Sequence, residues 1–292
     1  MSQKKIDFIC PPGASHWVGD GFLMTNFIPY QKGLSMRDMD PFILLDYGTK
    51  IYVKPGGEPK GVGVHPHRGF ETVTIAYHGE AEHHDSKGNH SIIKKGDVQW
   101  MTAGSGVLHK EYHSKDLAVN GGAFQMVQLW VNLPAKDKMA SPTYQALTNA
   151  ALTKVTLPDG SGVIEVIAGD YKGANGPAKT FSTVNVMNVK LGKNGKADFS
   201  LPASQNTALM AVEGDFLING VKLPEKNLLK FSHIGTDFTV EGKSETSTLL
   251  IISGEPLNEP IASYGPFVMN TEAQIQEAIR DMQTGKFGYL PD

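Results

Sequence analysis

The sequence predicts an all-β protein made of antiparallel strands, and three observations support this fold class. The chain of 292 residues contains 32 glycines and 17 prolines, which suits many tight turns between short segments. Several segments alternate apolar and polar residues with the period of a strand. The clearest of these segments are 71–77 (ETVTIAY), 124–132 (FQMVQLWVN), 182–191 (STVNVMNVKL) and 207–212 (TALMAV). Turn-forming residues separate the segments at 87–89 (KGN), 158–160 (PDG), 194–195 (NG) and 219–220 (NG).

A weak internal repeat indicates two β-barrel halves. Residues 71–80 align with residues 206–215, and the positions between their ends are hydrophobic in both segments. Residues 134–150, with two prolines and a Lys-Asp-Lys cluster, resemble a linker or crossing segment. We therefore expect an N-terminal domain over residues 1–135 and a C-terminal domain over residues 136–292.

One helix is expected near the end of the chain, over residues 272–284. Thr271 and Gln274 have the spacing of a capping box, and Gly285 is a suitable stop. Apolar residues at positions 275, 278, 279 and 282 share one helical face, which we expect to pack on a barrel.

Composition excludes several classes of function. The hydrophobic content is 40%, the charged content is 20% and the formal net charge is -3, so the chain is expected to be globular and not to bind nucleic acid directly. No apolar run is long enough to span a membrane, and residues 1–10 do not resemble a signal peptide. Cys10 is the single cysteine, which fits a reducing compartment. We expect a cytoplasmic protein without membrane contact, and a monomer is plausible.

Histidines are concentrated in the first half of the chain. Eight of the ten lie between His65 and His113, a window of 49 residues. Residues two apart in a strand point to the same side, so His65 and His67 present two imidazoles to one barrel interior. His109 and Glu111 repeat that spacing. If the two segments are neighbouring strands, four nitrogen and oxygen donors converge on one divalent transition-metal ion.

A second glutamate competes with Glu111. Glu71 follows His67 by four residues and shares its face if the strand is regular, although Gly69 could break that regularity. Glu71 is therefore a candidate ligand, a candidate base, or an acceptor that orients a ligating imidazole; we favour the last role.

The remaining histidines of this region are expected not to bind the metal. His83 and His84 face opposite sides of a strand, so at most one points inward, and the others lie near turns or farther along a strand: His16, His78, His90 and His113. Four further residues could border a substrate cavity, although a core position suits them better: Trp100, Met101, Phe124 and Gln125.

Two long segments resemble the pirin family of the cupin superfamily. They are residues 65–86 (HPHRGFETVTIAYHGEAEHHDS) and residues 96–111 (GDVQWMTAGSGVLHKE), and shorter segments at 40–46 (DPFILLD) and 264–271 (YGPFVMNT) extend the resemblance over nearly the whole chain. The resemblance implies a bicupin, with two antiparallel jelly-roll barrels and a short C-terminal helix.

The resemblance also implies an iron(II) site, with other divalent transition metals possible, at positions matching His65, His67, His109 and Glu111. It favours Glu111 over Glu71 as the fourth ligand, although many other cupins use the glutamate of the first motif. The repeat places Ser200 and Pro202 where the first half has His65 and His67, so no second metal site is expected there.

For function, the resemblance implies a quercetin 2,3-dioxygenase activity, in which a flavonol-like substrate is cleaved with O2. Glu111 or Glu71 would serve as the base. Two alternatives stay open at this point. One is a redox-responsive iron protein that binds a transcription factor or metabolic enzyme, and the other is a cupin whose metal is purely structural.

Overall fold

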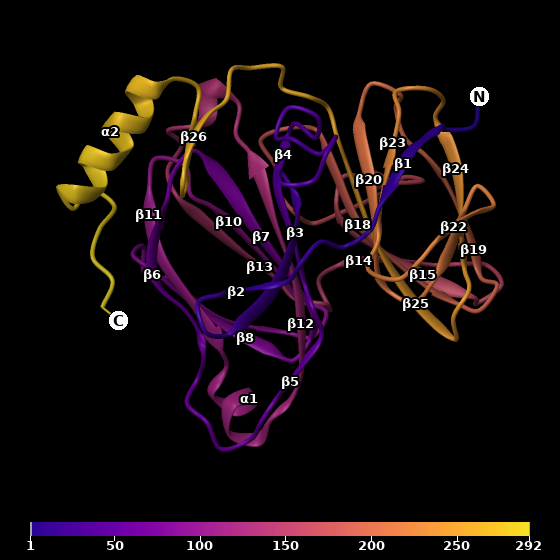
Figure 1. Ribbon diagram of the computed structural model, residues 1–292, viewed down its shortest axis with the longest axis horizontal. Coiled ribbons are helices and arrows are strands. Elements are labelled where there is room, and N and C mark those ends of the chain that lie inside the picture. The colour runs from indigo at the N-terminus through magenta and orange to yellow at the C-terminus, as the bar shows by residue number, and fades with distance from the viewer. Residues whose placement is uncertain (1, 292) are drawn as a thin grey trace.

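The structure, a computed structural model, describes residues 2–291, and its regular secondary structure consists mostly of β-strands. Two barrels lie side by side, and each combines one large and one small antiparallel sheet (Figure 1). This architecture confirms the predicted fold class.

The N-terminal barrel holds the histidine-rich region. Its large sheet has the order β13-β10-β7-β12-β4-β3-β2, with β5 also paired to β12: β2 (His16–Val18), β3 (Phe22–Ile28), β4 (Phe42–Gly48), β5 (Ile51–Val53), β7 (Phe70–His78), β10 (Val98–Thr102), β12 (Gly122–Asn132) and β13 (Thr143–Leu147). Its small sheet has the order β6-β11-β8-β9: β6 (Gly61–His67), β8 (Glu80–Asp85), β9 (His90–Lys94) and β11 (Val107–His113).

The C-terminal barrel repeats this plan. Its large sheet has the order β1-β23-β20-β25-β18-β15-β14: β1 (Ile6–Cys10), β14 (Thr153–Thr156), β15 (Gly162–Ala168), β18 (Val184–Gly192), β20 (Asn206–Glu213), β23 (Leu228–Phe231) and β25 (Thr246–Gly254). Its small sheet has the order β19-β24-β21-β22: β19 (Lys196–Ser200), β21 (Phe216–Ile218), β22 (Val221–Leu223) and β24 (Asp237–Gly242). Since β20 and β21 occupy the places of β7 and β8, the alignment of the two halves reflects a real structural repeat.

Helices and short hairpins complete the fold. They are α1 (Lys115–Asn120), the 3-10 turn η1 (Ala135–Asp137), α2 (Glu272–Gln283), and the strand pairs β16 (Asp170–Tyr171) with β17 (Ala174–Asn175) and β26 (Ala262–Tyr264) with β27 (Phe267–Met269). The capping box of α2 is formed as predicted, with Thr271 accepting from the backbone of Gln274. Within residues 2–291, neither α-helix has the length and apolar character needed to cross a bilayer.

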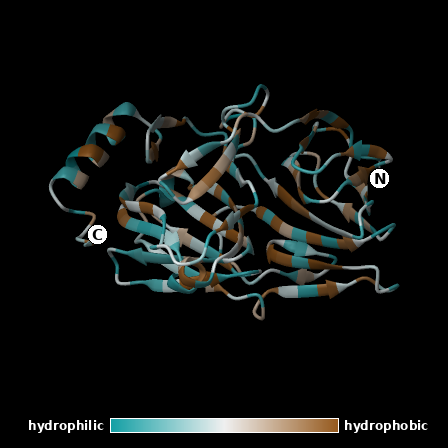
Figure 2. Cartoon of the chain, turned by 60° about the horizontal axis from the view of Figure 1, so that its bottom comes forward, coloured by the Kyte–Doolittle hydropathy of each residue, from teal (hydrophilic) through white to brown (hydrophobic). Residues whose placement is uncertain are grey.

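Strand alternation is clearest where one face of a sheet meets water. In β8 and β11 every second residue is buried, and the same alternation of apolar and polar residues is visible along several strands in Figure 2. The turns follow the predicted chemistry, since Asn194 and Asn219 have φ angles of 65° and 52°. These turns set the register that decides which side chains face the barrel interior.

The expected boundary near residue 135 does not separate the two barrels cleanly. Strand β1 pairs with β23 of the C-terminal barrel, whereas β13 lies in the expected linker and pairs with β10 of the N-terminal barrel. The C-terminal segment also returns to the first barrel, because α2 packs near Leu108 of β11 (Figure 1) and the Arg68 guanidinium pairs with Asp281 at 2.8 Å. The halves therefore exchange segments at both ends.

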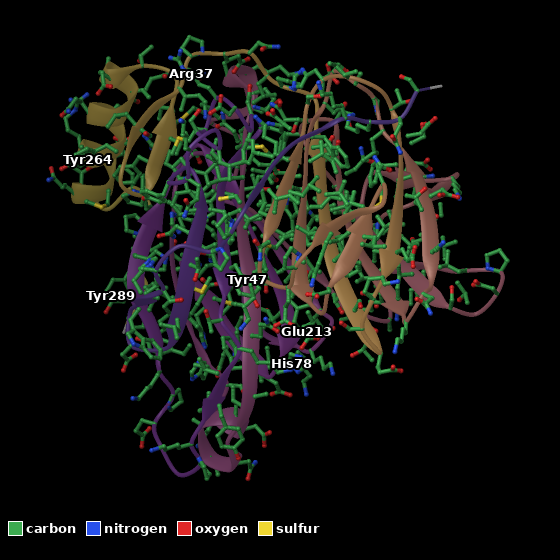
Figure 3. The ribbon with its side chains drawn as sticks, turned by 45° about the vertical axis from the view of Figure 1, so that its right-hand side comes forward. Arg37, Tyr47, His78, Glu213, Tyr264 and Tyr289 are labelled. Atoms are coloured by element: carbon green, nitrogen blue, oxygen red, sulfur yellow. The ribbon has the colours of Figure 1, made fainter. Side chains whose placement is uncertain are left out.

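The largest hydrophobic core lies between the two large sheets. Val73 and Leu129 from the first half pack in one buried cluster with Met210 and Ile252 from the second. Polar contacts border this core: the Tyr47 hydroxyl donates to the carbonyl of Val212 at 3.2 Å. The side chains of His78 and Glu213 meet across the same junction at 2.8 Å (Figure 3). The small sheet of the N-terminal barrel faces away from this junction and carries the candidate site.

Candidate metal centre

Three of the predicted histidines meet inside the N-terminal barrel. His65 and His67 lie on β6, and His109 lies on the neighbouring strand β11, directly opposite His65 in the antiparallel register. The ring centroids are 4.2 Å apart for His65 and His109, 4.9 Å for His65 and His67, and 4.8 Å for His67 and His109. One ring nitrogen from each histidine lies within 4.8 Å of the other two, so the three can bind one ion.

The hydrogen bonds of the three rings leave nitrogen atoms free for a cation. His65 directs Nδ1 at the carbonyl oxygen of Gly63, 2.8 Å away, which leaves Nε2 available. Among the described residues, His67 Nδ1 and His109 Nε2 are buried and have no hydrogen-bond partner. Buried polar atoms are rarely left unpaired, so the residues present fit a metal ion.

Electrostatics favour the neutral, ligating form of the imidazoles. Burial, followed by the proximity of His65, lowers the pKa of His67 well below its usual value. Burial also lowers the pKa of His109, and the neighbouring histidines add to the effect. Both rings are therefore neutral at pH 7, as metal coordination requires.

Glu111 is brought to the same region on β11. Its carboxylate is buried and accepts hydrogen bonds from Thr74, Gln99 and Gln128, at 3.3, 3.3 and 3.2 Å respectively. An oxygen of Glu111 lies within 4.8 Å of ligand atoms of His109 and His83. The three donors are neutral, so the carboxylate is held in place without a cationic side chain to neutralise it.

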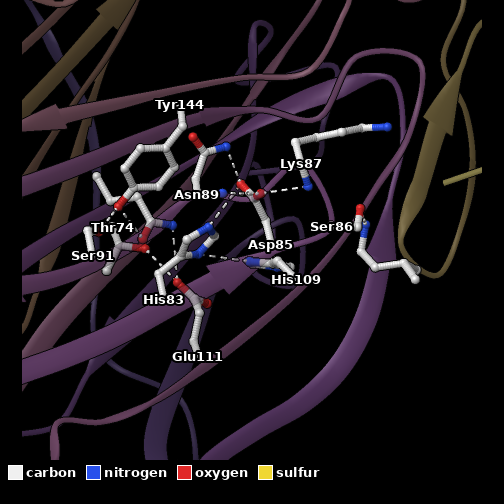
Figure 4. Close-up of polar contacts among 12 residues, drawn as sticks. Thr74, His83, Asp85, Ser86, Lys87, Asn89, Ser91, His109, Glu111 and Tyr144 are labelled. Carbon is white, nitrogen blue, oxygen red and sulfur yellow. Dashed lines mark hydrogen bonds and ion pairs between the residues drawn. The ribbon is translucent and has the colours of Figure 1, made fainter. Parts of the chain in front are cut away.

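His83 belongs to this constellation, although the sequence predicts it as a non-ligand. It is fully buried on β8, its Nδ1 lies 3.4 Å from Nδ1 of His109, and its Nε2 lies 3.3 Å from Oδ2 of Asp85 (Figure 4). The backbone amides of Lys87 and Asn89 donate to the other oxygen of Asp85 at 2.9 and 3.0 Å. A neutral His83 that donates to Asp85 accepts from His109 Nδ1, which directs the lone pair of His109 Nε2 toward the metal position.

The structure places Glu71 away from the histidines. Glu71 accepts a hydrogen bond from Thr102 at 2.8 Å and has the strand parity of Val73, which belongs to the core between the barrels. Thr74, of opposite parity, contacts Glu111. The chain leaves the small sheet after His67 and enters the large sheet at Phe70. The alternation of inward and outward side chains is therefore interrupted between the two strands, and it cannot be counted from His67 to Glu71. These contacts do not bring Glu71 to the group of histidines, and its expected role beside the metal stays a prediction.

A cavity of about 280 Å³ adjoins the site and is lined by His65, His67 and Glu111. The rest of its wall is largely apolar and consists of Val18, Phe22, Met24, Leu44, Asp46, Val62, Met126, Gln128 and Trp130. The four residues considered for this role from the sequence are buried elsewhere: Trp100, Met101, Phe124 and Gln125. Their side chains point to the other face of their strands or lie beyond the end of the cavity. By contrast, Met126, Gln128 and Trp130 are spaced two residues apart on β12, so the period of a strand could have identified them as a set that shares one face.

The other histidines lie outside the group of three. His84 and His90 are on the outer surface, which agrees with the prediction that at most one of His83 and His84 points inward. His16 is exposed, and His78 is bound to Glu213 at the junction of the halves. His113 is buried against Phe22 and Phe124.

Two jelly-roll barrels of one chain, the first with histidines gathered on its small sheet, define a bicupin. Comparison with known proteins refines this class. Residues 24–131 match the model of the Pirin family, and residues 186–288 match the model of the Pirin C-terminal cupin domain. The chain belongs to the pirin family.

Individual relatives cover nearly the whole chain. A protein of Pseudomonas aeruginosa named "Putative quercetin 2,3-dioxygenase" is 43% identical, over 98% of this chain and 99% of its own length. Human Pirin is 34% identical, over 88% of this chain and 86% of its own length. A solved structure of quercetin 2,3-dioxygenase from Acinetobacter baumannii has a TM-score of 0.93 and 45% identity, and the match covers 99% of this chain and 100% of the other.

Proposed function

We propose that this protein is an iron-dependent dioxygenase that cleaves a flavonol-like, quercetin-type substrate with O2. The names of the relatives from Pseudomonas aeruginosa and Acinetobacter baumannii support this reaction class. In the proposed reaction both oxygen atoms of O2 enter the products, the heterocycle opens and carbon monoxide leaves.

The observation that carries the proposal is the position of the donor group at the wall of a small-molecule cavity. His65, His67 and Glu111 all line the cavity of about 280 Å³, which is slightly smaller than the usual ligand pocket of roughly 300–1,000 Å³. A purely structural metal needs no such opening, because closed sites use all their positions for protein ligands. Three imidazoles and one carboxylate leave coordination positions free on an octahedral ion.

The proposed ligands are His65, His67, His109 and Glu111. When bound, a redox-active ion such as iron(II) supplies an anchor for an anionic oxygen and a route for the reaction of triplet O2 with a closed-shell substrate. Because the imidazoles are neutral and only one ligand is anionic, a bound divalent ion would keep a net positive charge. This charge would favour binding of a deprotonated hydroxyl of the substrate.

Glu111 is the proposed base. Its carboxylate lines the cavity, and it accepts hydrogen bonds from Gln128, which lines the same cavity, and from Thr74 and Gln99 behind it. These donors fix the orientation of the carboxylate toward a substrate hydroxyl.

The largely apolar wall of the cavity suits the flat aromatic rings of such a substrate. Trp130 stacks on Phe70 with a centroid distance of 4.3 Å and meets His67 edge to face at 5.2 Å, so the indole ring is held rigidly. Phe22 and Met126 line the same cavity and exclude water from the reacting groups.

Aerobic turnover of quercetin by the iron-loaded protein tests the proposal. We expect loss of the flavonol absorbance together with release of carbon monoxide. The variants His65→Ala and Glu111→Ala should lose this activity, whereas His233→Ala, a control on the exposed surface of the second barrel, should retain it. Equal turnover by all four proteins would overturn the assignment of the site.

Metal analysis of protein purified without added metal tests the choice of iron. Iron, bound in proportion to activity, supports the proposal. A tightly held stoichiometric zinc with no turnover after exchange for iron would instead indicate a structural metal.

A further inference from the structure

Three potential ligands gather on the outer face of the β8–β9 hairpin. Along β8, His83 points into the barrel, whereas Glu82 and His84 point outward. His90 on β9 lies directly opposite His84 in the antiparallel register. Cross-strand neighbours and residues two apart share a face, so the strand pairing itself brings the three side chains together.

The two imidazoles converge on one carboxylate oxygen. The rings of His84 and His90 are stacked, with centroids 4.1 Å apart and planes inclined by 12°. Nε2 of His84 lies 3.0 Å from Oε1 of Glu82, and Nε2 of His90 lies 2.8 Å from the same atom. The ligand atoms of all three residues lie within 4.8 Å of one another. For the two histidine–carboxylate pairs, a widening of a few tenths of an ångström gives the spacing of ligands on an ion with bonds of about 2.0–2.2 Å.

The charges and exposure of the group suit a cation from solution. Burial opposes ionisation of Glu82, but hydrogen bonds from His84 and His90 outweigh it and lower the pKa of the carboxyl group. The relative exposures of the side chains are 24% for Glu82, 35% for His84 and 54% for His90, so an ion can reach them. Lys110 is the cross-strand neighbour of His84 on β11, and its ammonium is bound to the carbonyl of Pro291 at 2.7 Å.

We propose that Glu82, His84 and His90 form a second divalent-metal site, separate from the centre inside the barrel. Two imidazole nitrogens and one carboxylate oxygen suit zinc, copper(II) or nickel(II), whereas magnesium and calcium prefer oxygen donors alone. Water completes the coordination. The site lies on the opposite face of β8 from His83, so the two metal positions do not share a ligand.

Zinc stoichiometry tests this proposal. Dialysis of the intact protein against zinc, followed by metal analysis, should give one more zinc ion per chain in the wild type than in His84→Ala or His90→Ala. Zinc should also raise the melting temperature of the wild type more than that of either variant, because the ion joins β8 to β9. The control His233→Ala, also an exposed histidine, should behave as the wild type.

The inner centre must be separated from the proposed outer site. The variant His65→Ala, which removes an inner donor, should retain the zinc that is lost in His90→Ala. Unchanged stoichiometry in His84→Ala and His90→Ala would overturn the proposal, as would a wild type whose only zinc is lost in His65→Ala. Turnover of quercetin does not enter this test, so its outcome is independent of the proposed dioxygenase activity.

Discussion

His83 lies between His109, a proposed metal ligand, and the carboxylate of Asp85. Its contacts with His109 and Asp85, at 3.4 and 3.3 Å, place it where it sets the tautomer of a proposed ligand. The replacement His83→Phe removes the acceptor for His109 Nδ1. We expect iron affinity to fall roughly 10- to 100-fold, as for other partners of ligating histidines.

Competition with a chelator measures this affinity, and the His90→Ala background confines the measurement to the inner centre. Tyr144→Phe is the matched control, because it keeps the ring that stacks on His83 at 4.8 Å and should bind iron as the parent does. Unaltered iron affinity in His83→Phe would show that His83 merely fills space.

Glu71 is a buried acid that accepts a hydrogen bond from Thr102, and we expect its titration to affect stability and not metal binding. Burial raises the pKa of Glu71 to about 7, against the opposing hydrogen bond from Thr102. Between pH 4.5, the pKa in the unfolded state, and about pH 7, Glu71 keeps its proton in the folded state but loses it in the unfolded state. Protonation of Glu71 therefore stabilises the folded state fully below pH 4.5, and this stabilisation is lost as the pH rises through 7. Relative to Glu71→Gln, the wild type should lose about 3 kcal/mol of unfolding free energy between pH 4.5 and 8.

Urea unfolding of both proteins at a series of pH values measures this difference. The same Glu71→Gln variant should keep wild-type iron binding and quercetin turnover. A pH-independent difference in stability would contradict the raised pKa, and lost iron binding would restore Glu71 to the metal site.

Sequence spacing was sufficient to find the donors that share one sheet. The pairs His65 with His67 and His109 with Glu111 depend only on the period of two within a strand, and the pairing of β6 with β11 then brings the segments together. Glu71 could not be placed in this way, because the chain changes sheets between His67 and Phe70. The contribution of His83 depends on the pairing of β8 with β11, which local sequence does not encode.

At the scale of elements, local sequence patterns predicted the strands and the helix, but they did not predict which barrel the strands near the ends of each half would join. The segment containing β13 looked like a linker because it includes Pro134 and Pro142, but both prolines precede the strand. The pairing of β13 with β10 is a non-local contact. The capping box of α2 was predictable because all its atoms come from Thr271 and Gln274. Elements that are stabilised by contacts between residues close in the sequence can therefore be predicted from the sequence.

The cap of α2 gives a prediction at this scale. Thr271→Ala removes the side-chain oxygen that accepts from the backbone amide of Gln274 at 3.3 Å. We expect a loss of about 1 kcal/mol in stability, measured by chemical unfolding. Gln276→Ala, at an exposed position of the same helix, is the control and should change stability little. Equal stabilities of the two variants would show that the cap contributes nothing to the packed C-terminal segment.

At the scale of the whole molecule, the two barrels are expected to unfold as one unit. Their large sheets share a single core. In addition, the N-terminal strand β1 belongs to the C-terminal barrel, and the C-terminal helix α2 lies against the N-terminal barrel. Ile252 lies on β25 in the second half and is buried in the shared core with Val73 and Leu129 of the first. Truncation of Ile252 therefore leaves a cavity between the halves and removes contacts from both.

We expect Ile252→Ala to lower the unfolding free energy by about 3 kcal/mol in a single transition. The denaturant midpoints for release of iron from the N-terminal centre and for loss of β-sheet circular dichroism should fall together, because the metal centre should unfold when the shared core unfolds. Val221→Ala, at a position that is 46% exposed in the second half, should shift neither signal. Iron release that stays at the wild-type midpoint while the circular dichroism shifts would show that the first barrel is stable without the second.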